Sequence, residues 1–244
     1  MYKCTQTSSR AWRFSALAFL VFGLLVFLPG CSDSNDNSPV QPQEDLRTRF
    51  NLQTLGEIPY PPDNLPRQER ISLGRLIFFD PILGGEKNVA CGTCHHPDFG
   101  FADRRQFGAG TSGSGLGPNR IVSRSDITGE AIQLEPRHTP SIWNTAFNAD
   151  ESGVPSAVGF QFLDGRTRGL EQQAKKPIGS RVEMKGDAYS AAAALDSVIV
   201  RLRAIPEYVK RFQDAFPEDV ASKPGAAIID TLNYGRAIAA YERE

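Results

Sequence analysis

The sequence predicts a mainly α-helical fold with long irregular loops. Four segments repeat apolar residues with the period of a helix, residues 67–79, 187–203, 206–216 and 224–244. Between the first two of these segments, residues 105–136 hold five glycines from position 108 to position 117, which disfavours regular structure. No repeat of fixed period and no run of alternating strands is found, so helices are expected to build the core.

Apolar stripes define the face that each predicted helix buries. The helix over 67–79 ends at Asp80-Pro81, because a residue before proline disfavours the helical backbone. A short helix over 170–175 stops at Pro177, and the helix over 206–216 has proline in its first turn. The side chains expected in the core are Ile71, Leu73, Leu76, Ile77, Phe78 and Phe79 (67–79), Leu195, Val198, Ile199 and Leu202 (187–203), and Ile228, Leu232, Ile238 and Tyr241 (224–244).

The first thirty residues have the pattern of a bacterial signal peptide. Three basic residues and no acidic one accompany an apolar run from Ala16 to Leu28, which is shorter than the roughly 20 residues of a membrane span. The tetrapeptide at 28–31, LPGC, resembles a lipobox. We expect cleavage before Cys31 and lipid attachment to this cysteine, which places the protein on the periplasmic side of a bacterial membrane. Ordinary signal cleavage nearby and an uncleaved anchor stay open as alternatives.

Without residues 1–30 the chain keeps 214 of its 244 residues, enough for one domain of ordinary size. Because the removed segment carries three basic residues and no acidic one, the net charge falls from −1 to −4, which argues against nucleic-acid binding. Residues 31–56 begin with a polar stretch and are expected to be a flexible tether. Residues 57–244 are expected to form the folded domain.

The motif Cys91-Gly92-Thr93-Cys94-His95 is typical of c-type haem attachment. Each thiol adds to one vinyl group of the porphyrin, and one helical turn places both sulfurs at the same edge of the ring. His95 then supplies a neutral imidazole nitrogen as the proximal iron ligand. A thioredoxin-like redox pair would not need the histidine, and a zinc site would need further ligands where the chain offers only His96 nearby. We therefore expect one covalent haem c in a cytochrome c-like domain.

Seven segments, taken in order, resemble the bacterial di-haem cytochrome c peroxidases, a family that includes the methylamine-utilisation MauG type. The resemblance runs from about Ile58 to the C-terminus and rests on residues 73–81, 91–103, 137–144, 164–166, 170–174 with Pro177, 182–184 and 237–243. It implies a haem peroxidase in which an N-terminal haem reduces hydrogen peroxide to water. It also implies a second, C-terminal haem that receives electrons from a small donor protein, a cytochrome or a cupredoxin.

The resemblance also implies the residues of the catalytic pocket. Positions matching Gln173 and Glu183 line the distal side of the peroxidatic haem, and Pro177 matches a residue on the same wall. Splitting the O–O bond requires a proton to move from one oxygen to the other, and a carboxylate can carry it as base and then as acid. An amide can hold the peroxide without titrating. Without the family spacing, Glu183 would be interpreted as a solvated charge and Gln173 as an exposed helix residue.

Four features depart from the family pattern. The chain has one CxxCH motif and ends at Glu244, where the second domain would begin, so we expect either a truncated product or a separate haem protein as partner. Residues 97–137 contain no histidine that could act as a switchable distal ligand. His138 replaces an asparagine that often binds calcium, and calcium is therefore doubtful, because histidine is a poor calcium ligand. Leu163 replaces a tryptophan often found between the two haems.

Two other functions stay open at this stage. A mono-haem electron carrier would result if Met184 closed the sixth coordination position of the iron, although a packing role for Met184 is favoured. An inactive truncated fragment that binds haem is the other. The sequence favours an exported haem peroxidase over both, because Gln173 and Glu183 suit an open iron site.

Overall fold

The computed structural model describes residues 45–52 and 54–244. Thr54–Glu244 form one compact unit. The short helix α1 (Leu46–Arg49) belongs to a separate unit that ends at Gln53, and none of its residues is buried. Cys31 and the predicted signal peptide lie outside the described residues. No helix within residues 45–52 and 54–244 is long and apolar enough to cross a membrane.

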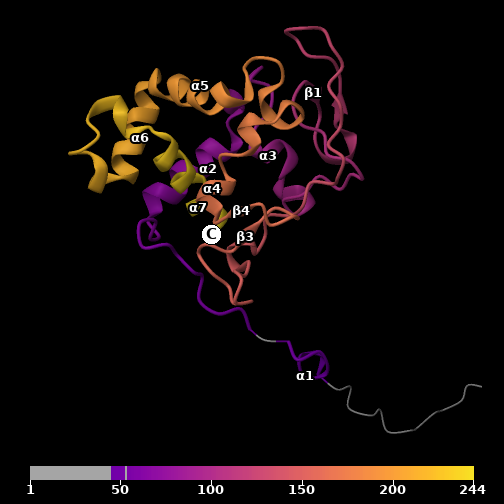
Figure 1. The fold of residues 1–244 in the computed structure, drawn as a ribbon, viewed down its shortest axis with the longest axis vertical. Helices are drawn as coiled ribbons and strands as arrows, with labels where there is room; N and C mark the ends of the chain where they lie inside the picture. Colours follow the sequence, from indigo (N-terminus) through magenta and orange to yellow (C-terminus); the bar gives the residue numbers. More distant parts are fainter. Residues whose placement is uncertain (1–44, 53) are drawn as a thin grey trace, which may run out of the picture. The chain divides into compact units, whose positions relative to one another are not determined.

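Four longer helices form the body of the unit: α2 (Gln68–Phe79), α5 (Ala191–Arg203), α6 (Pro206–Ala215) and α7 (Thr231–Glu242). Helix α7 is the most buried, because eight consecutive residues from Asn233 to Ala240 are buried. It packs against α2, and Gly74 of α2 allows the close approach, because a side chain there would collide with the carbonyl group of Ala237. Figure 1 shows α2, α4 and α7 near the centre, with α5 and α6 to one side.

The predicted core stripes are confirmed in most positions. Leu73, Ile77 and Phe78 are buried, as are the stripe residues Val198, Ile199 and Leu202 of α5 and Ile228 and Ile238 near the C-terminus. Leu195 and Tyr241 are partly buried and pack against the same core cluster.

Three stripe positions are wrong: Leu76 (39% exposed), Phe79 (36%) and Leu232 (38%). In α2 the buried face is set by Leu73, Gly74, Ile77 and Phe78, so Leu76 and Phe79 lie on the other side. The ring of Phe79 packs directly against Gly92, which ties α2 to the cysteine motif.

Two helices begin later than predicted because local caps compete with the helical pattern. Helix α5 starts after Ser190, whose hydroxyl accepts a hydrogen bond from the Ala193 N–H at 3.3 Å. Helix α7 starts after Asp230, whose carboxylate accepts a hydrogen bond from the Asn233 N–H at 2.8 Å. The residues before Asp230 form instead a 3₁₀ turn, Gly225–Ile228. The helix predicted over 170–175 is shorter, α4 (Leu170–Gln173).

The chain between α2 and α5 is mostly irregular, as predicted for residues 105–136. Two antiparallel pairs of very short strands interrupt it, β1 (Gly113–Ser114) with β2 (Ile121–Val122) and β3 (Phe160–Gln161) with β4 (Thr167–Arg168). The registers pair Gly113 with Val122 and Phe160 with Arg168. The other short elements are the α-helical turn α3 (Cys91–Cys94), the π-helical turn Arg181–Lys185 and the 3₁₀ turns Pro81–Leu83, Pro97–Phe99, Gly117–Asn119, Thr145–Phe147, Pro177–Gly179 and Pro217–Asp219. The fold is therefore mainly α with long loops.

Polar side chains hold the loop segments to one another. The Glu86 carboxylate accepts hydrogen bonds from the hydroxyls of Ser112 at 2.6 Å and Ser125 at 2.7 Å. The Arg120 guanidinium donates to the carbonyl oxygens of Ala109 (2.9 Å) and Gly110 (2.5 Å). Because the loops have few apolar residues to bury, these bonds supply the fixed geometry that packing supplies elsewhere.

Candidate haem-binding site

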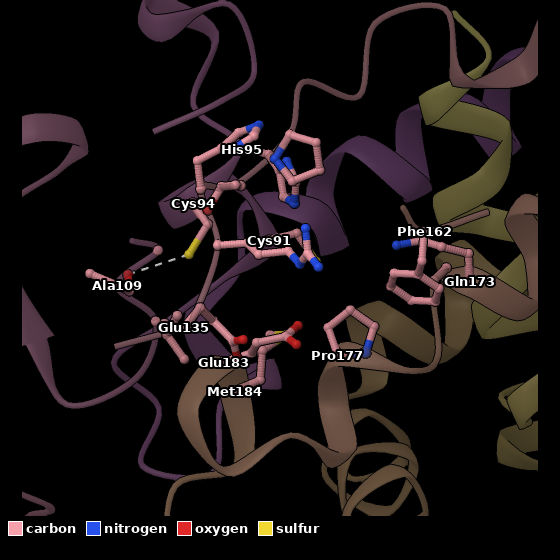
Figure 2. A pocket seen from close by; sticks show the side chains of 18 of the residues that line it. Cys91, Cys94, His95, Ala109, Glu135, Phe162, Gln173, Pro177, Glu183 and Met184 are labelled. Carbon is pink, nitrogen blue, oxygen red and sulfur yellow. Dashed lines mark hydrogen bonds between the residues drawn. The ribbon is translucent and has the colours of Figure 1, made fainter. Parts of the chain in front are cut away.

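A cavity of about 350 Å³ lies between the helical body and the loops. Its wall includes every site residue predicted within the described part of the chain: Cys91, Cys94, His95, Gln173 and Glu183. Figure 2 shows Cys91, Cys94 and His95 on one side, Phe162 and Gln173 on the opposite side, and Glu135 and Glu183 below. Apolar side chains such as Phe78, Val89 and Ile238 complete the wall. Its size and mostly apolar lining are typical of a small-molecule or cofactor site.

The cysteine motif forms one helical turn, α3. The His95 N–H donates to the Cys91 carbonyl at 2.9 Å, and the Ala90 N–H donates to the Thr93 hydroxyl at 2.9 Å, which starts the turn. The Cys94 thiol donates to the Ala109 carbonyl at 3.4 Å. Burial raises the pKa of the Cys94 thiol to about 12 and raises that of Cys91 as well. Reactive redox pairs need a lowered thiol pKa, so this environment argues against the thioredoxin-like interpretation.

His95 is held in the form that an iron ligand requires. Its Nδ1 lies 3.1 Å from the Phe101 carbonyl oxygen, which can only accept, so Nδ1 carries the proton and Nε2 is left with its lone pair. Burial lowers the pKa of His95, against the opposing effects of the Phe101 and Pro140 carbonyls and of Asp103. The imidazole is therefore neutral at pH 7.

Gln173 and Glu183 both come from one continuous segment of the wall, residues 170–185. Helix α4 places Gln173, whose Oε1 is buried and has no hydrogen-bond partner in the described part of the chain. The π-helical turn places Glu183, and its backbone N–H donates to the Ser180 hydroxyl at 3.3 Å. Such turns are frequent at functional sites. Burial, and then the charge of Glu135, raise the pKa of Glu183 to about 7.

Sequence reasoning missed Glu135. It lies near the end of the glycine-rich loop, and the structure brings it into the cavity beside Glu183. Burial raises its pKa, while Ser180, Arg166 and a hydrogen bond with Glu183 oppose the rise. No local sequence pattern predicts this position of Glu135, because its neighbour in the cavity, Glu183, is distant in the sequence.

Glu242 of α7 is a second buried acid that sequence reasoning missed. It lines the same cavity, and its Oε2 has no hydrogen-bond partner in the described residues. Burial raises its pKa to about 8, against the nearby positive charge of Arg243. The carboxyl is therefore mostly protonated at neutral pH.

The remaining residues weighed from the sequence also line the cavity. Met184 is 4% exposed and belongs to the main core cluster, as expected for a packing residue. Leu163 is 77% exposed and His138 is exposed, so both lie where the cavity wall meets solvent.

The residues of the cavity fit a haem c group. Two thiols on one helical turn, a neutral histidine whose Nδ1 is held by a carbonyl, and a largely apolar wall are the groups that such a cofactor needs. The unpartnered oxygens of Gln173 and Glu242 are the buried polar atoms for which a bound ligand would account. Among residues 45–52 and 54–244, no cluster of three or more His, Cys, Asp or Glu side chains could hold a metal ion by itself.

A profile of the di-haem cytochrome c peroxidase family matches residues 68–244. The chain belongs to this family. The di-haem cytochrome c peroxidases bind haem c, so the family explains the cysteine motif and the cavity next to it.

The chain is similar to two known members of the family over part of their length. It is 31% identical to the methylamine utilization protein MauG of Methylorubrum extorquens over 202 residues, which are 82% of this chain and 47% of that protein. It is 33% identical to the cytochrome c551 peroxidase of Pseudomonas aeruginosa over 175 residues, which are 72% of this chain and 38% of that protein. The chain therefore spans less than half the length of these relatives.

A solved structure has the same fold. A MauG-like protein associated with microbial copper homeostasis aligns with a TM-score of 0.52 and 25% identity, covering 80% of this chain and 45% of that one. The predicted cytochrome c-like, mainly α fold is thus confirmed.

Proposed function

We propose that this chain is an exported peroxidase that binds one covalent haem c and reduces hydrogen peroxide with electrons from a donor protein. The observation that carries the proposal is that Cys91, Cys94, His95, Gln173 and Glu183 all line the same cavity. Cys91 and Cys94 would hold the porphyrin through thioether bonds, and the Nε2 of His95 would bind the iron. Gln173 and Glu183 face the substrate.

When bound, haem c supplies the redox-active iron at which the peroxide is reduced. The protein's own part is proton transfer and orientation. With a pKa raised to about 7, the Glu183 carboxyl exchanges a proton readily at neutral pH in both directions. The Gln173 amide holds the peroxide by hydrogen bonds without titrating, and its unpartnered Oε1 is available for this. Pro177, on the same wall, has no N–H that could compete for the substrate.

The partners follow from the electron count. Two electrons are needed for each peroxide, and a small cytochrome or cupredoxin, or a separate haem protein, would deliver them. We place the protein on the periplasmic side of a bacterial membrane, anchored by lipid at Cys31. The N-terminal sequence supports this placement, because basic residues, an apolar run and a lipobox-like tetrapeptide follow one another there.

A mono-haem electron carrier is the second candidate, and Met184 is the residue on which it depends. Met184 lines the cavity directly after Glu183, so its thioether is the side chain able to close the iron site. Its burial in the main core cluster favours packing instead.

The test uses the ferric holoprotein, matured with covalent haem. A high-spin optical spectrum, together with peroxide consumption that depends on a reduced donor protein, is the expected result. A low-spin spectrum that Met184→Ala converts to high-spin would instead support the carrier. A high-spin protein that consumes no peroxide with any cytochrome or cupredoxin donor would leave an inactive haem-binding fragment.

A further inference from the structure

Two glutamates from distant parts of the chain meet in the cavity. Glu135 comes from the end of the glycine-rich loop and Glu183 from the π-helical turn. Figure 2 shows their carboxyl groups side by side. The Glu183 backbone N–H donates to the Ser180 hydroxyl at 3.3 Å, and the nearby charge of Glu135 raises the pKa of Glu183.

The backbone locks the two segments against each other. The Glu135 N–H donates to the Gly108 carbonyl at 2.9 Å, and the Gly108 N–H donates to the Arg137 carbonyl at 2.8 Å. Two residues further on, Gly110 lies on the turn so closely that a side chain there would collide with the carbonyl groups of Val182 and Glu183. The Thr111 N–H donates to the Val182 carbonyl at 3.3 Å. The approach of Glu135 to Glu183 is thus built into the backbone.

We propose that Glu135 and Glu183 share one proton, so that the proton-transferring unit of the cavity is a carboxyl pair in which Glu135 is the positioning and proton-sharing residue. The catalytic role of the carboxyl pair rests on the proposed peroxidase function, whereas the pair itself rests on the geometry of the two glutamates.

Electrostatics supports one proton and one negative charge for the pair. Two adjacent carboxylates in a partly desolvated site repel each other, so they do not both ionise near neutral pH. Burial is the main cause of the raised pKa of both groups, and the Glu135 charge raises that of Glu183 further. Arg166 lowers both pKa values, but its guanidinium pairs with Asp164 at 2.9 Å and stacks over Phe162.

The other titratable groups of the cavity wall do not change the charge state of the carboxyl pair. They are Cys91, Cys94, His95, Arg137, His138 and Glu242. The two thiols and His95 are neutral at pH 7, and burial keeps Glu242 mostly protonated. Arg137 and His138 are exposed, so solvent screens them.

A shared proton suits the chemistry. Glu183, ionised while Glu135 holds the shared proton, takes the proton from one peroxide oxygen and gives a proton to the other oxygen as the O–O bond breaks. The bonding electron pair leaves with the oxygen that receives the proton, and the donor protein supplies two electrons. With two further protons from solvent, two waters form. The pair ends with the single proton and single negative charge with which it began.

The test measures the titration of the pair directly, in the ferric holoprotein, by the infrared C=O stretch of protonated carboxyl groups against pH. The Glu183 band is isolated by two difference spectra: wild type against Glu183→Gln, and Glu135→Gln against the Glu135→Gln/Glu183→Gln double variant. We expect Glu135→Gln to lower the pKa of Glu183 by about one unit or more, because it removes a neighbouring charge. We expect the pH profile of kcat/KM for peroxide to shift the same way.

Glu130→Gln is the matched control, because it removes a carboxylate from the same loop. The Glu130 side chain is 78% exposed, and its ion pair, from Oε2 to the Arg181 guanidinium, is long at 3.8 Å. It should move neither the infrared titration nor the pH profile. Glu135→Asp keeps the charge and serves if Glu135→Gln loses haem. An unchanged pKa of Glu183 in Glu135→Gln would overturn the pair. So would a pKa shift that in both Glu135 variants is no larger than in Glu130→Gln. If Glu135 and Glu183 titrate as a coupled pair but the wild-type protein consumes no peroxide, the carboxyl pair is supported and the peroxidase function is refuted.

Discussion

The helical body and the loop region of this chain are stabilised by opposite means. In α7, the buried run is mostly apolar, and the four long helices meet in one core cluster. In the glycine-rich loop, the buried side chains are mostly polar, namely Thr111, Ser112, Arg120 and Ser125, with Ala109 and Ile132 as the apolar ones. The helices therefore provide free energy by apolar burial, whereas the loop depends on satisfied hydrogen bonds.

This difference explains where the cavity lies. Cys91, His95 and Glu135 belong to the loop region, while α2 and α7 contribute only apolar groups and Glu242 to the wall. A packed helical surface keeps the wall rigid, and irregular backbone can aim carbonyls and carboxyls at one point. Perturbing the loop region should consequently change chemistry, and perturbing the helices should change stability.

The largest expected effect is on cofactor attachment. Cys94→Ser removes one of the two thioether bonds, so the holoprotein should carry a single thioether or fail to mature. Wild-type haem should resist acid–acetone extraction, whereas the variant's haem content should fall. Circular dichroism should show the helices retained, because the Cys94 side chain is no part of the main core cluster. Haem that acid–acetone removes from the wild-type protein would contradict c-type attachment.

Glu183→Gln should slow peroxide consumption by about 10²–10⁴-fold, the usual range for general acid–base catalysis. The substitution keeps the shape of the side chain and removes its titrating group, so haem content and melting temperature should stay close to wild type. Steady-state kcat/KM with a fixed electron donor is the measurement. A loss of less than tenfold would mean that another group moves the proton.

Phe212→Ala tests the helical side. Phe212 is fully buried in α6 and stacks with Phe216 at a centroid distance of 6.1 Å. Removing it should lower the free energy of unfolding by about 3–5 kcal/mol, because a cavity replaces packed atoms. Urea denaturation would measure the loss. The spectrum of the haem in the folded fraction should be unchanged, and a changed one would break the proposed separation between the two regions.

Glu86→Gln should weaken the loop by about 1–3 kcal/mol, because it removes a charged acceptor from two serine hydroxyls. Hydrogen exchange should rise in the glycine-rich loop and not in α7. The serine hydroxyls hold the pKa of Glu86 below its usual value, although burial opposes them. This stabilisation is therefore complete above the ordinary pKa of 4.5 and is lost as pH falls through the lower, folded-state pKa.

The last expected effect is a pH dependence of stability in the apoprotein. Folded Glu183 keeps its proton up to about pH 7, whereas an unfolded chain loses it near the ordinary value of 4.5. The folded state binds more protons in this interval, so the free energy of unfolding should fall as pH rises from about 4.5 to about 7. In Glu183→Gln this decline should shrink, as thermal denaturation at several pH values would reveal. An equal decline in both proteins would place the Glu183 pKa near normal.

What the sequence by itself determined is local. The CxxCH spacing depends on one helical turn, and the core stripes of α2 and α5 depend on helical periodicity, so both could be predicted. Gln173 and Glu183 were predicted through the family spacing, and the structure brings both to the wall of the cavity that His95 also lines. The late starts of α5 and α7 were missed, because side-chain caps at Ser190 and Asp230 compete with the apolar period.

Only the tertiary structure decided which acids share the cavity. Glu135 and Glu242 carry no local signal, since a glutamate at a loop end or a helix end is usually solvated. They are brought there by contacts between segments distant in sequence, such as that of Gly110 with the turn that carries Glu183. Burial then raises the pKa of all three glutamates, and burial is a property of the folded chain and not of any stretch of its sequence.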